Sequence, residues 1–243
     1  MGKLVGWAVH LFTASGLIFC FASLLAMNEQ NFRMAFVWLF VALIVDGFDG
    51  MLARAADVTR HLPGIQGKIM DHLIDFIGYA FLPAYFFHIS GLLPEGYAWL
   101  GTGVILMSSI LYYAKDGMVS EDYYFVGFPV LWNLVAFYLF FVFHLPPFTN
   151  LVLIVLLGIM HFIPLKYAYP SRMKGHRWFV WIITLSGLTA AAVLIWTYPQ
   201  EIVFLQWLLI LVLIGFTFLV VWTSFHLSRA RSPGSRSNSG SSD

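Results

Sequence analysis

The sequence has few charged residues and almost no cysteine. Of its 243 residues only 10% are Asp, Glu, Lys or Arg, whereas a water-soluble domain carries about a quarter. The single cysteine, Cys20, excludes an intramolecular disulfide and supplies no cluster of thiolates for a metal. The formal net charge of +1 argues against a nucleic-acid-binding surface. What remains is a chain that is 60% hydrophobic and 18% aromatic, which is typical of an integral membrane protein.

Apolar runs of the length of a membrane span follow one another along the chain. A helix needs about 20 residues to cross the hydrocarbon core, because each residue adds ~1.5 Å to a core that is ~30 Å thick. Proline and glycine separate the runs, and no run alternates between apolar and polar residues as a strand would. We therefore expect an all-α polytopic membrane protein with about eight transmembrane helices, at residues 6–27, 33–55, 68–90, 97–115, 125–144, 149–166, 177–197 and 203–226.

The positive charges predict which side of the membrane each loop faces. With the N-terminus in the cytoplasm, twelve of the thirteen Lys and Arg residues lie in cytoplasmic segments, and only Arg33 lies on the other side. Cytoplasmic loops are enriched in these residues, so we expect both termini to be cytoplasmic. Residues 1–227 then form a single transmembrane domain. Residues 228–243, rich in Ser, Gly and Arg, are expected to be a disordered cytoplasmic tail.

Four aspartates interrupt the apolar pattern at the facing ends of two consecutive predicted helices. Asp46 and Asp49 are three residues apart near the end of the second helix, so they share one helical face. Asp71 and Asp75 are four residues apart at the start of the third helix, where they extend a stripe that begins at Gly67. The connecting segment is short enough to make the two helices antiparallel neighbours. The two acidic stripes can then face each other.

Carboxylates in a membrane segment are costly and usually serve a function. An Asp at the centre of a transmembrane helix costs roughly 2.5–3.5 kcal/mol, and clustered like charges add repulsion. Several oxygen ligands on a rigid frame are what a hard divalent cation prefers. In the alternative interpretation, the aspartates lie at the membrane rim and pair with Arg54, Arg60 and Lys68. We favour the divalent-metal site.

These residues resemble the signature of the CDP-alcohol phosphotransferase family, Asp-x-x-Asp-Gly-x-x-Ala-Arg, a spacer, then Gly-x-x-x-Asp-x-x-x-Asp. The matching positions are Asp46, Asp49, Gly50, Ala53, Arg54, Gly67, Asp71 and Asp75. The spacer, residues 55–66, has twelve residues and is longer than is usual in the family. This spacer, the eight predicted spans and the segment 112–133 make the chain most similar to the bacterial phosphatidylcholine synthases.

The resemblance implies a role for each matching residue. A pair of Mn²⁺ or Mg²⁺ ions would be held by Asp46, Asp49, Asp71 and Asp75, and Asp75 would also be the catalytic general base. The CDP-lipid would contact Gly50, Ala53, Arg54 and Gly67. Close packing of helices is an alternative explanation for each glycine.

The similarity to this branch implies CDP-diacylglycerol and choline as the substrates. A quaternary ammonium donates no hydrogen bonds, so proteins bind it with aromatic faces and an acid. The predicted cytoplasmic loop and its flanks offer such side chains for choline, namely Tyr112, Tyr113, Glu121, Asp122, Tyr123, Tyr124 and Trp132. An interfacial aromatic belt explains the same residues equally well.

Two other functions stay open. Another member of the family would use serine, inositol or glycerol 3-phosphate, and the basic segment 166–177 could hold a phosphorylated acceptor. A divalent-cation channel or transporter would need acids at several depths, whereas these gather at one depth. The resemblance further implies a bacterial inner-membrane protein whose active site is on the cytoplasmic side, and a possible homodimer.

Overall fold

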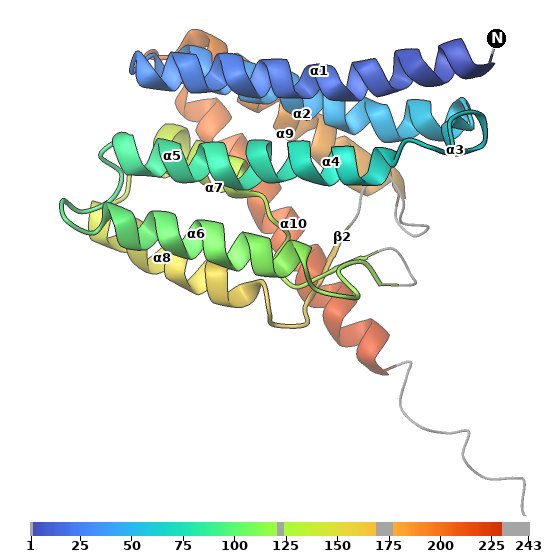
Figure 1. Cartoon of the computed structure of the whole chain (residues 1–243). Coiled ribbons are helices and arrows are strands. Elements are labelled where there is room, and N and C mark those ends of the chain that lie inside the picture. The colour runs from blue at the N-terminus through green and yellow to red at the C-terminus, as the bar shows by residue number, and fades with distance from the viewer. Residues whose placement is uncertain (1, 121–123, 169–176, 230–243) are drawn as a thin grey trace, which may run out of the picture.

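The computed structural model is a bundle of helices with one small sheet (Figure 1). It describes residues 2–120, 124–168 and 177–229. In chain order the elements of this part are α1 (Gly2–Asn28), α2 (Phe32–Ala55), α3 (Val58–His61), α4 (Gly67–Phe76), η1 (Ile77–Phe81), α5 (Leu82–Ile89), α6 (Ala98–Tyr113), β1 (Tyr124–Val126), α7 (Trp132–Tyr138), η2 (Leu139–Phe143), α8 (Pro147–Met160), β2 (Lys166–Ala168), α9 (Arg177–Thr197) and α10 (Val203–Arg229).

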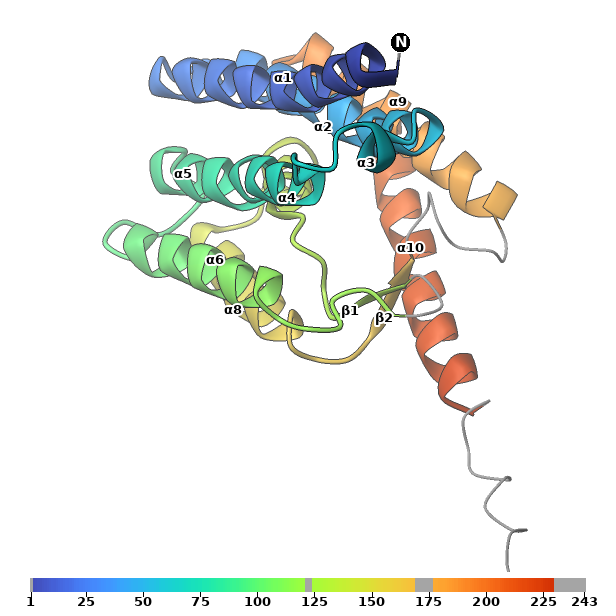
Figure 2. The ribbon, with the colours of Figure 1, turned by 45° about the vertical axis from the view of Figure 1, so that its right-hand side comes forward.

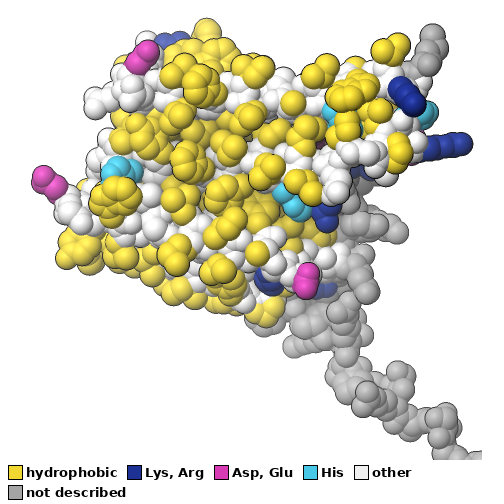
Figure 3. Space-filling model, in the orientation of Figure 1, with side chains coloured by type: hydrophobic (Ala, Val, Ile, Leu, Met, Phe, Trp, Pro, Cys, Tyr) yellow, Lys and Arg dark blue, Asp and Glu magenta, His cyan; other side chains and the backbone are white. Residues whose placement is uncertain are grey.

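The helices fit a membrane protein. Four of them are long and apolar enough to cross a bilayer, namely α1, α2, the Val180–Thr197 part of α9 and the Val203–Trp222 part of α10. Three shorter apolar helices are α6, Trp132–Phe143 and α8. Apolar side chains cover most of the face in Figure 3, and Lys and Arg gather at the end where α1 begins. This distribution is the one that an apolar bilayer flanked by charged interfaces selects.

The prediction of a helix from residue 125 was wrong over its first seven residues. β1 pairs there with β2 in an antiparallel sheet in which Phe125 lies opposite Tyr167, so the expectation of no strands was also wrong. Gly127 follows with a φ of +93°, a conformation that favours glycine and ends the strand. Figure 2 shows the sheet beside α10, and the Lys166 amide donates to the Ser224 hydroxyl at 2.9 Å.

The predicted tail begins later than expected. Helix α10 continues to Arg229, so residues 228 and 229 are helical. The rest of the predicted tail, residues 230–243, lies outside the described residues.

Helices α1 and α2 pack closely because α1 buries small side chains. Gly6, Thr13, Gly16 and Ser23 all lie on the buried face of α1. Small residues let helix backbones approach each other, which is how helices associate where lipid removes the hydrophobic driving force. The Ser23 hydroxyl also donates to the carbonyl of Ala35 on α2 at 2.9 Å.

The long spacer between the two halves of the motif folds into the one-turn helix α3. Its Val58 is buried, and a side chain at Gly6 of α1 would meet Leu62 at 2.9 Å and Val58 at 3.8 Å. The additional spacer residues therefore cover the first turns of α1.

Residues 67–89 form one helical run with a π-helical turn in its middle. The Leu82 amide donates to the Ile77 carbonyl, five residues back rather than four. Pro83 follows directly; it has no N–H for the Tyr79 carbonyl, and its ring crowds that carbonyl. The wide turn of η1 (Ile77–Phe81) lies directly before this proline, between the acidic half of the run and its apolar half.

The apolar half of the run contributes to an aromatic core. The rings of Phe36 and Phe86 meet edge to face at 5.0 Å, and Phe140 and Phe141 of η2 pack against Phe36. Edge-to-face pairs add roughly 0.5–1.5 kcal/mol each beyond burial. This core fixes α2 relative to α5 and η2, and therefore fixes the helix that carries Asp46 and Asp49.

We expect Gly127→Ala to destabilise the protein strongly. A Cβ atom at this position would stand 2.1 Å from the backbone oxygen of His161, and an L residue pays roughly 1–2 kcal/mol for the left-handed conformation alone. The melting temperature of the detergent-purified protein should fall by about 5 °C or more. Gly103→Ala is the control, because a Cβ there meets nothing within 4 Å. Equal melting temperatures for the two variants would contradict the expectation.

Candidate metal centre

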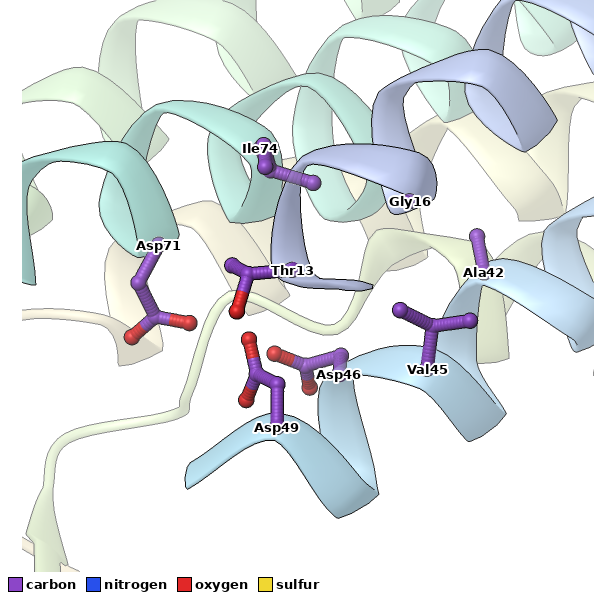
Figure 4. Close-up of a pocket in the computed structure, with 8 residues that line it drawn as sticks. All are labelled: Thr13, Gly16, Ala42, Val45, Asp46, Asp49, Asp71 and Ile74. Carbon is purple, nitrogen blue, oxygen red and sulfur yellow. The ribbon is translucent and has the colours of Figure 1, made fainter. Parts of the chain in front are cut away.

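Three of the four aspartates meet in a pocket formed by α1, α2 and α4 (Figure 4). One carboxylate oxygen from each of Asp46, Asp49 and Asp71 lies within 4.8 Å of the other two. Thr13 and Gly16 of α1, Ala42 and Val45 of α2 and Ile74 of α4 complete the lining. The two acidic stripes therefore face each other, with α1 as a third wall.

Asp75 lies beside this group, one turn along the run from Asp71. Its carboxyl group is close enough to Asp46, Asp71 and Asp49 for their charges to act on it. Asp46 accepts a hydrogen bond of 2.6 Å from the Tyr79 hydroxyl through Oδ2. Asp46 is thus the residue that links the three-carboxylate group to the rest of the acidic stripe on α4.

Few cations lie close to the carboxylates of Asp46, Asp49 and Asp75 in the described part of the chain, and Arg54 is near enough for its charge to act on Asp49. Among the residues that the structure describes, no Lys or Arg lies within 4.0 Å of the carboxylates of Asp46, Asp49 or Asp75. Two carboxylates at 4.8 Å repel each other by on the order of 3 kcal/mol at an effective dielectric constant of ~20. A bound cation would remove this cost.

The donor set fits a hard divalent cation. Each residue offers carboxylate oxygen, and two oxygens at ~2.1 Å from one Mg²⁺ stand at most ~4.2 Å apart. The spacing of up to 4.8 Å is close to this limit, so small side-chain movements suffice. Asp46, Asp49 and Asp71 can hold one ion, or share two.

Helix α1 supports the site directly. The side chain of Thr13 hydrogen-bonds with Asp49, and both residues are buried. Figure 4 shows the Thr13 hydroxyl directed at the carboxylates. A donor on α1 fixes the orientation of a carboxylate on α2, as outer-shell partners do in metal sites.

The two motif glycines have different neighbours. A Cβ atom at Gly67 would stand 3.1 Å from Cε1 of the buried His10 ring, so the absent side chain makes room for α1. At Gly50 a Cβ would meet Nη1 of Arg54 at 3.3 Å. Packing therefore gives a reason for Gly67. Arg54 is exposed, and half-buried Ala53 precedes it at the end of α2.

The aromatic candidates for choline divide into two groups. Tyr113 lies near the acids, close enough to Asp75, Asp46 and Asp71 for their charges to act on its phenol. Its ring also meets His72 at 5.8 Å and Phe76 at 6.2 Å. Tyr113 on α6 and these two rings on α4 form an aromatic wall beside the acidic stripe.

Tyr112 and Trp132 pack elsewhere. Both are fully buried, and their rings lie 5.3 Å and 5.4 Å from the ring of His161. Phe128 stacks on the same imidazole at 5.4 Å, so His161 fills the space among these rings. The pKa of Tyr167 nearby on β2 is raised by burial, which keeps this phenol neutral.

Of the remaining candidates, Tyr124 lies in β1. The ammonium group of Lys166 lies 5.6 Å from the centroid of the Tyr124 ring. Glu121, Asp122 and Tyr123 lie outside the described residues, as does the 169–176 part of the basic segment.

An apolar helical bundle with three converging carboxylates defines a membrane protein with a candidate divalent-metal centre. The chain belongs to the CDP-alcohol phosphatidyltransferase family, whose model matches residues 8–165 and so includes all four aspartates. It is 40% identical to a phosphatidylcholine synthase of Pseudomonas aeruginosa over 194 residues, which is 77% of this chain and 81% of that protein. It is 39% identical to a phosphatidylcholine synthase of Rhizobium meliloti over 171 residues, 70% of each chain.

We expect Asp49→Asn and Asp71→Asn each to weaken Mn²⁺ binding at least tenfold, because each removes a charged ligand from the shared pocket. Electron paramagnetic resonance of free Mn²⁺ measures this binding in purified protein without substrate. Asp116→Asn, at an exposed position after α6, is the control. Unchanged binding in either pocket variant would remove that residue from the site.

Proposed function

We propose that this protein transfers the phosphatidyl group of CDP-diacylglycerol to choline and releases CMP. The observation that carries the proposal is the convergence of Asp46, Asp49 and Asp71, at the spacing of the family motif, in one pocket. The identity of 39–40% to two phosphatidylcholine synthases supports choline as the acceptor.

Each residue has a defined part in this reaction. Mn²⁺ or Mg²⁺ in the pocket would supply positive charge to the diphosphate and to the departing CMP. Asp46, Asp49 and Asp71 hold that positive charge in place, and Arg54 at the end of α2 contacts phosphate. Ala53 and the glycines at 50 and 67 keep this surface open to the nucleotide.

Asp75 acts as the general base. The oxygen of the choline hydroxyl forms a bond to the lipid-side phosphorus while the bond from that phosphorus to CMP breaks, and the proton passes to Asp75. Asp75 lies beside the three-carboxylate group but not in it, which supports separate roles for the four acids. The base must reach the acceptor hydroxyl while the other three acids bind metal.

Choline approaches past Tyr113 in this proposal. A quaternary ammonium is attracted to an aromatic face and to negative charge, and Tyr113 with His72 and Phe76 lies beside the acids. The buried Tyr112 and Trp132 do not contact choline in this proposal; they pack on His161 and stabilise the end of α6 that carries Tyr113. Glu121, Asp122, Tyr123 and Tyr124 stay predicted contacts of choline.

The proposal includes a topology of eight spans with both termini in the cytoplasm of a bacterial cell. Four spans are the long helices. The other four are the helical run of residues 67–89 and the shorter segments α6, α7–η2 and α8. The pocket then lies toward the inner surface of the cytoplasmic membrane, where the positive charges gather. The homodimer implied by the resemblance stays a prediction.

The acceptor assay tests the function. Purified protein in micelles with CDP-diacylglycerol and Mn²⁺ should release CMP with choline, and at least a hundredfold more slowly with serine, inositol or glycerol 3-phosphate. A chelator should abolish turnover and added Mn²⁺ should restore it. Because Asp75 lies outside the group of three carboxylates, Asp75→Asn should still bind Mn²⁺. It should release no CMP, because the general base is lost. Product formation with another alcohol and none with choline would overturn the acceptor assignment.

Tyr113→Ala should raise the KM for choline about tenfold, since cation–π contacts contribute roughly 0.5–2 kcal/mol. Tyr113→Phe should retain most of the affinity because the ring remains. Tyr97→Ala is the control for loss of an aromatic ring, because this exposed tyrosine precedes α6 at the end opposite to Tyr113. A normal KM for choline in Tyr113→Ala would show that choline binds elsewhere.

A further inference from the structure

Tyr79 makes a short hydrogen bond to the acidic group and is not part of the family motif. Its hydroxyl donates to Oδ2 of Asp46 at 2.6 Å, across the interface between η1 and α2. A separation of 2.5–2.7 Å is typical of a hydroxyl bound to an ionised carboxylate, and such bonds are about twice as strong as neutral ones. The side chain is half-buried, so this bond forms with limited access of solvent.

The position of Tyr79 in the chain extends the acidic stripe. Gly67, Asp71, Asp75 and Tyr79 recur every four residues. In a regular α-helix each such step drifts by about 40°, so the stripe would turn away from α2. Tyr79 lies within the π-helical turn, where more residues per turn reduce the drift. The wide turn therefore keeps the hydroxyl facing the same helix as the two aspartates before it.

We propose that Tyr79 is a positioning residue that holds the Asp46 carboxylate for metal binding. The bond from the phenol to Oδ2 fixes the plane of the Asp46 carboxylate, and so fixes the direction in which its oxygens are offered to a cation. Thr13 holds Asp49 from α1 in a comparable way. Two of the three carboxylates thus receive a hydrogen bond from a neighbouring helix. This inference rests on the proposed function only in taking Asp46 as a metal ligand.

The consequence is a measurable change in metal affinity. Partners that orient the ligands of a metal typically contribute 10- to 100-fold to affinity. Tyr79→Phe keeps the ring and removes only the hydroxyl, so Asp46 loses its fixed orientation. We expect the Kd for Mn²⁺ to rise about tenfold, measured by electron paramagnetic resonance of the full-length protein in detergent without substrate.

Tyr138→Phe is the matched control. Tyr138 is buried and donates to the backbone oxygen of Leu209 at 2.8 Å, away from the acids. Its loss removes a hydrogen bond of similar length without touching the pocket. Both variants should melt slightly below the wild type in chelator, and only Tyr79→Phe should need more Mn²⁺ for its melting temperature to rise.

A double-mutant cycle tests whether Tyr79 acts through Asp46. Asp46→Asn alone should weaken Mn²⁺ binding, and adding Tyr79→Phe should cause little further loss because the shared interaction is already gone. Fully additive losses, or wild-type affinity in Tyr79→Phe, would overturn the inference while leaving the proposed function intact. A wild-type protein that binds no Mn²⁺ would overturn both. Failure of the choline assay with this affinity pattern retained would overturn the acceptor alone.

Discussion

Repulsion among closely spaced carboxylates is the constraint on which the structure depends. Asp46, Asp49 and Asp71 lie within 4.8 Å of one another, and each pair carries an unfavourable energy of on the order of 3 kcal/mol unless a cation intervenes. Left alone, such groups would separate or take up protons. They stay together because α2 and α4 belong to one packed bundle. The aromatic core around Phe36 fixes α2, and the small residues of α1 fix how closely α4 approaches.

Different helices contribute different parts of the site. α2 and α4 supply the charges, whereas α1 supplies the hydroxyl of Thr13, the closeness allowed by Gly16 and the His10 ring beside Gly67. The segments after α6 serve a different purpose. The cluster of Tyr112, Phe128, Trp132 and His161 joins the end of α6 to the start of α7 and the end of α8, and so positions Tyr113 beside the acids.

The sequence predicted the acidic site better than its surroundings. Asp46 with Asp49 and Asp71 with Asp75 could be assigned to helix faces because their spacing matches the α-helical period. The hydrogen bond from Tyr79 could not be foreseen, because a π-helical turn changes that period locally. The pairing of Phe125 with Tyr167 joins segments far apart in the chain and is too short to show alternation. The contact of Thr13 with Asp49 depends on how α1 docks, which the apolar pattern of a membrane helix does not specify.

The π-helical turn at residues 77–81 also separates the two halves of its helical run in rotation. A π turn is equivalent to one residue inserted into an α-helix, so the faces before and after it are set independently. Gly67 to Asp75 can orient toward the acidic pocket, while Phe86 and Phe87 after the turn orient toward the aromatic core. Removing one residue from the turn would rotate one half by about 100° against the other. The helical run could then no longer present its aromatic side chains to the core and its aspartates to the pocket at the same time.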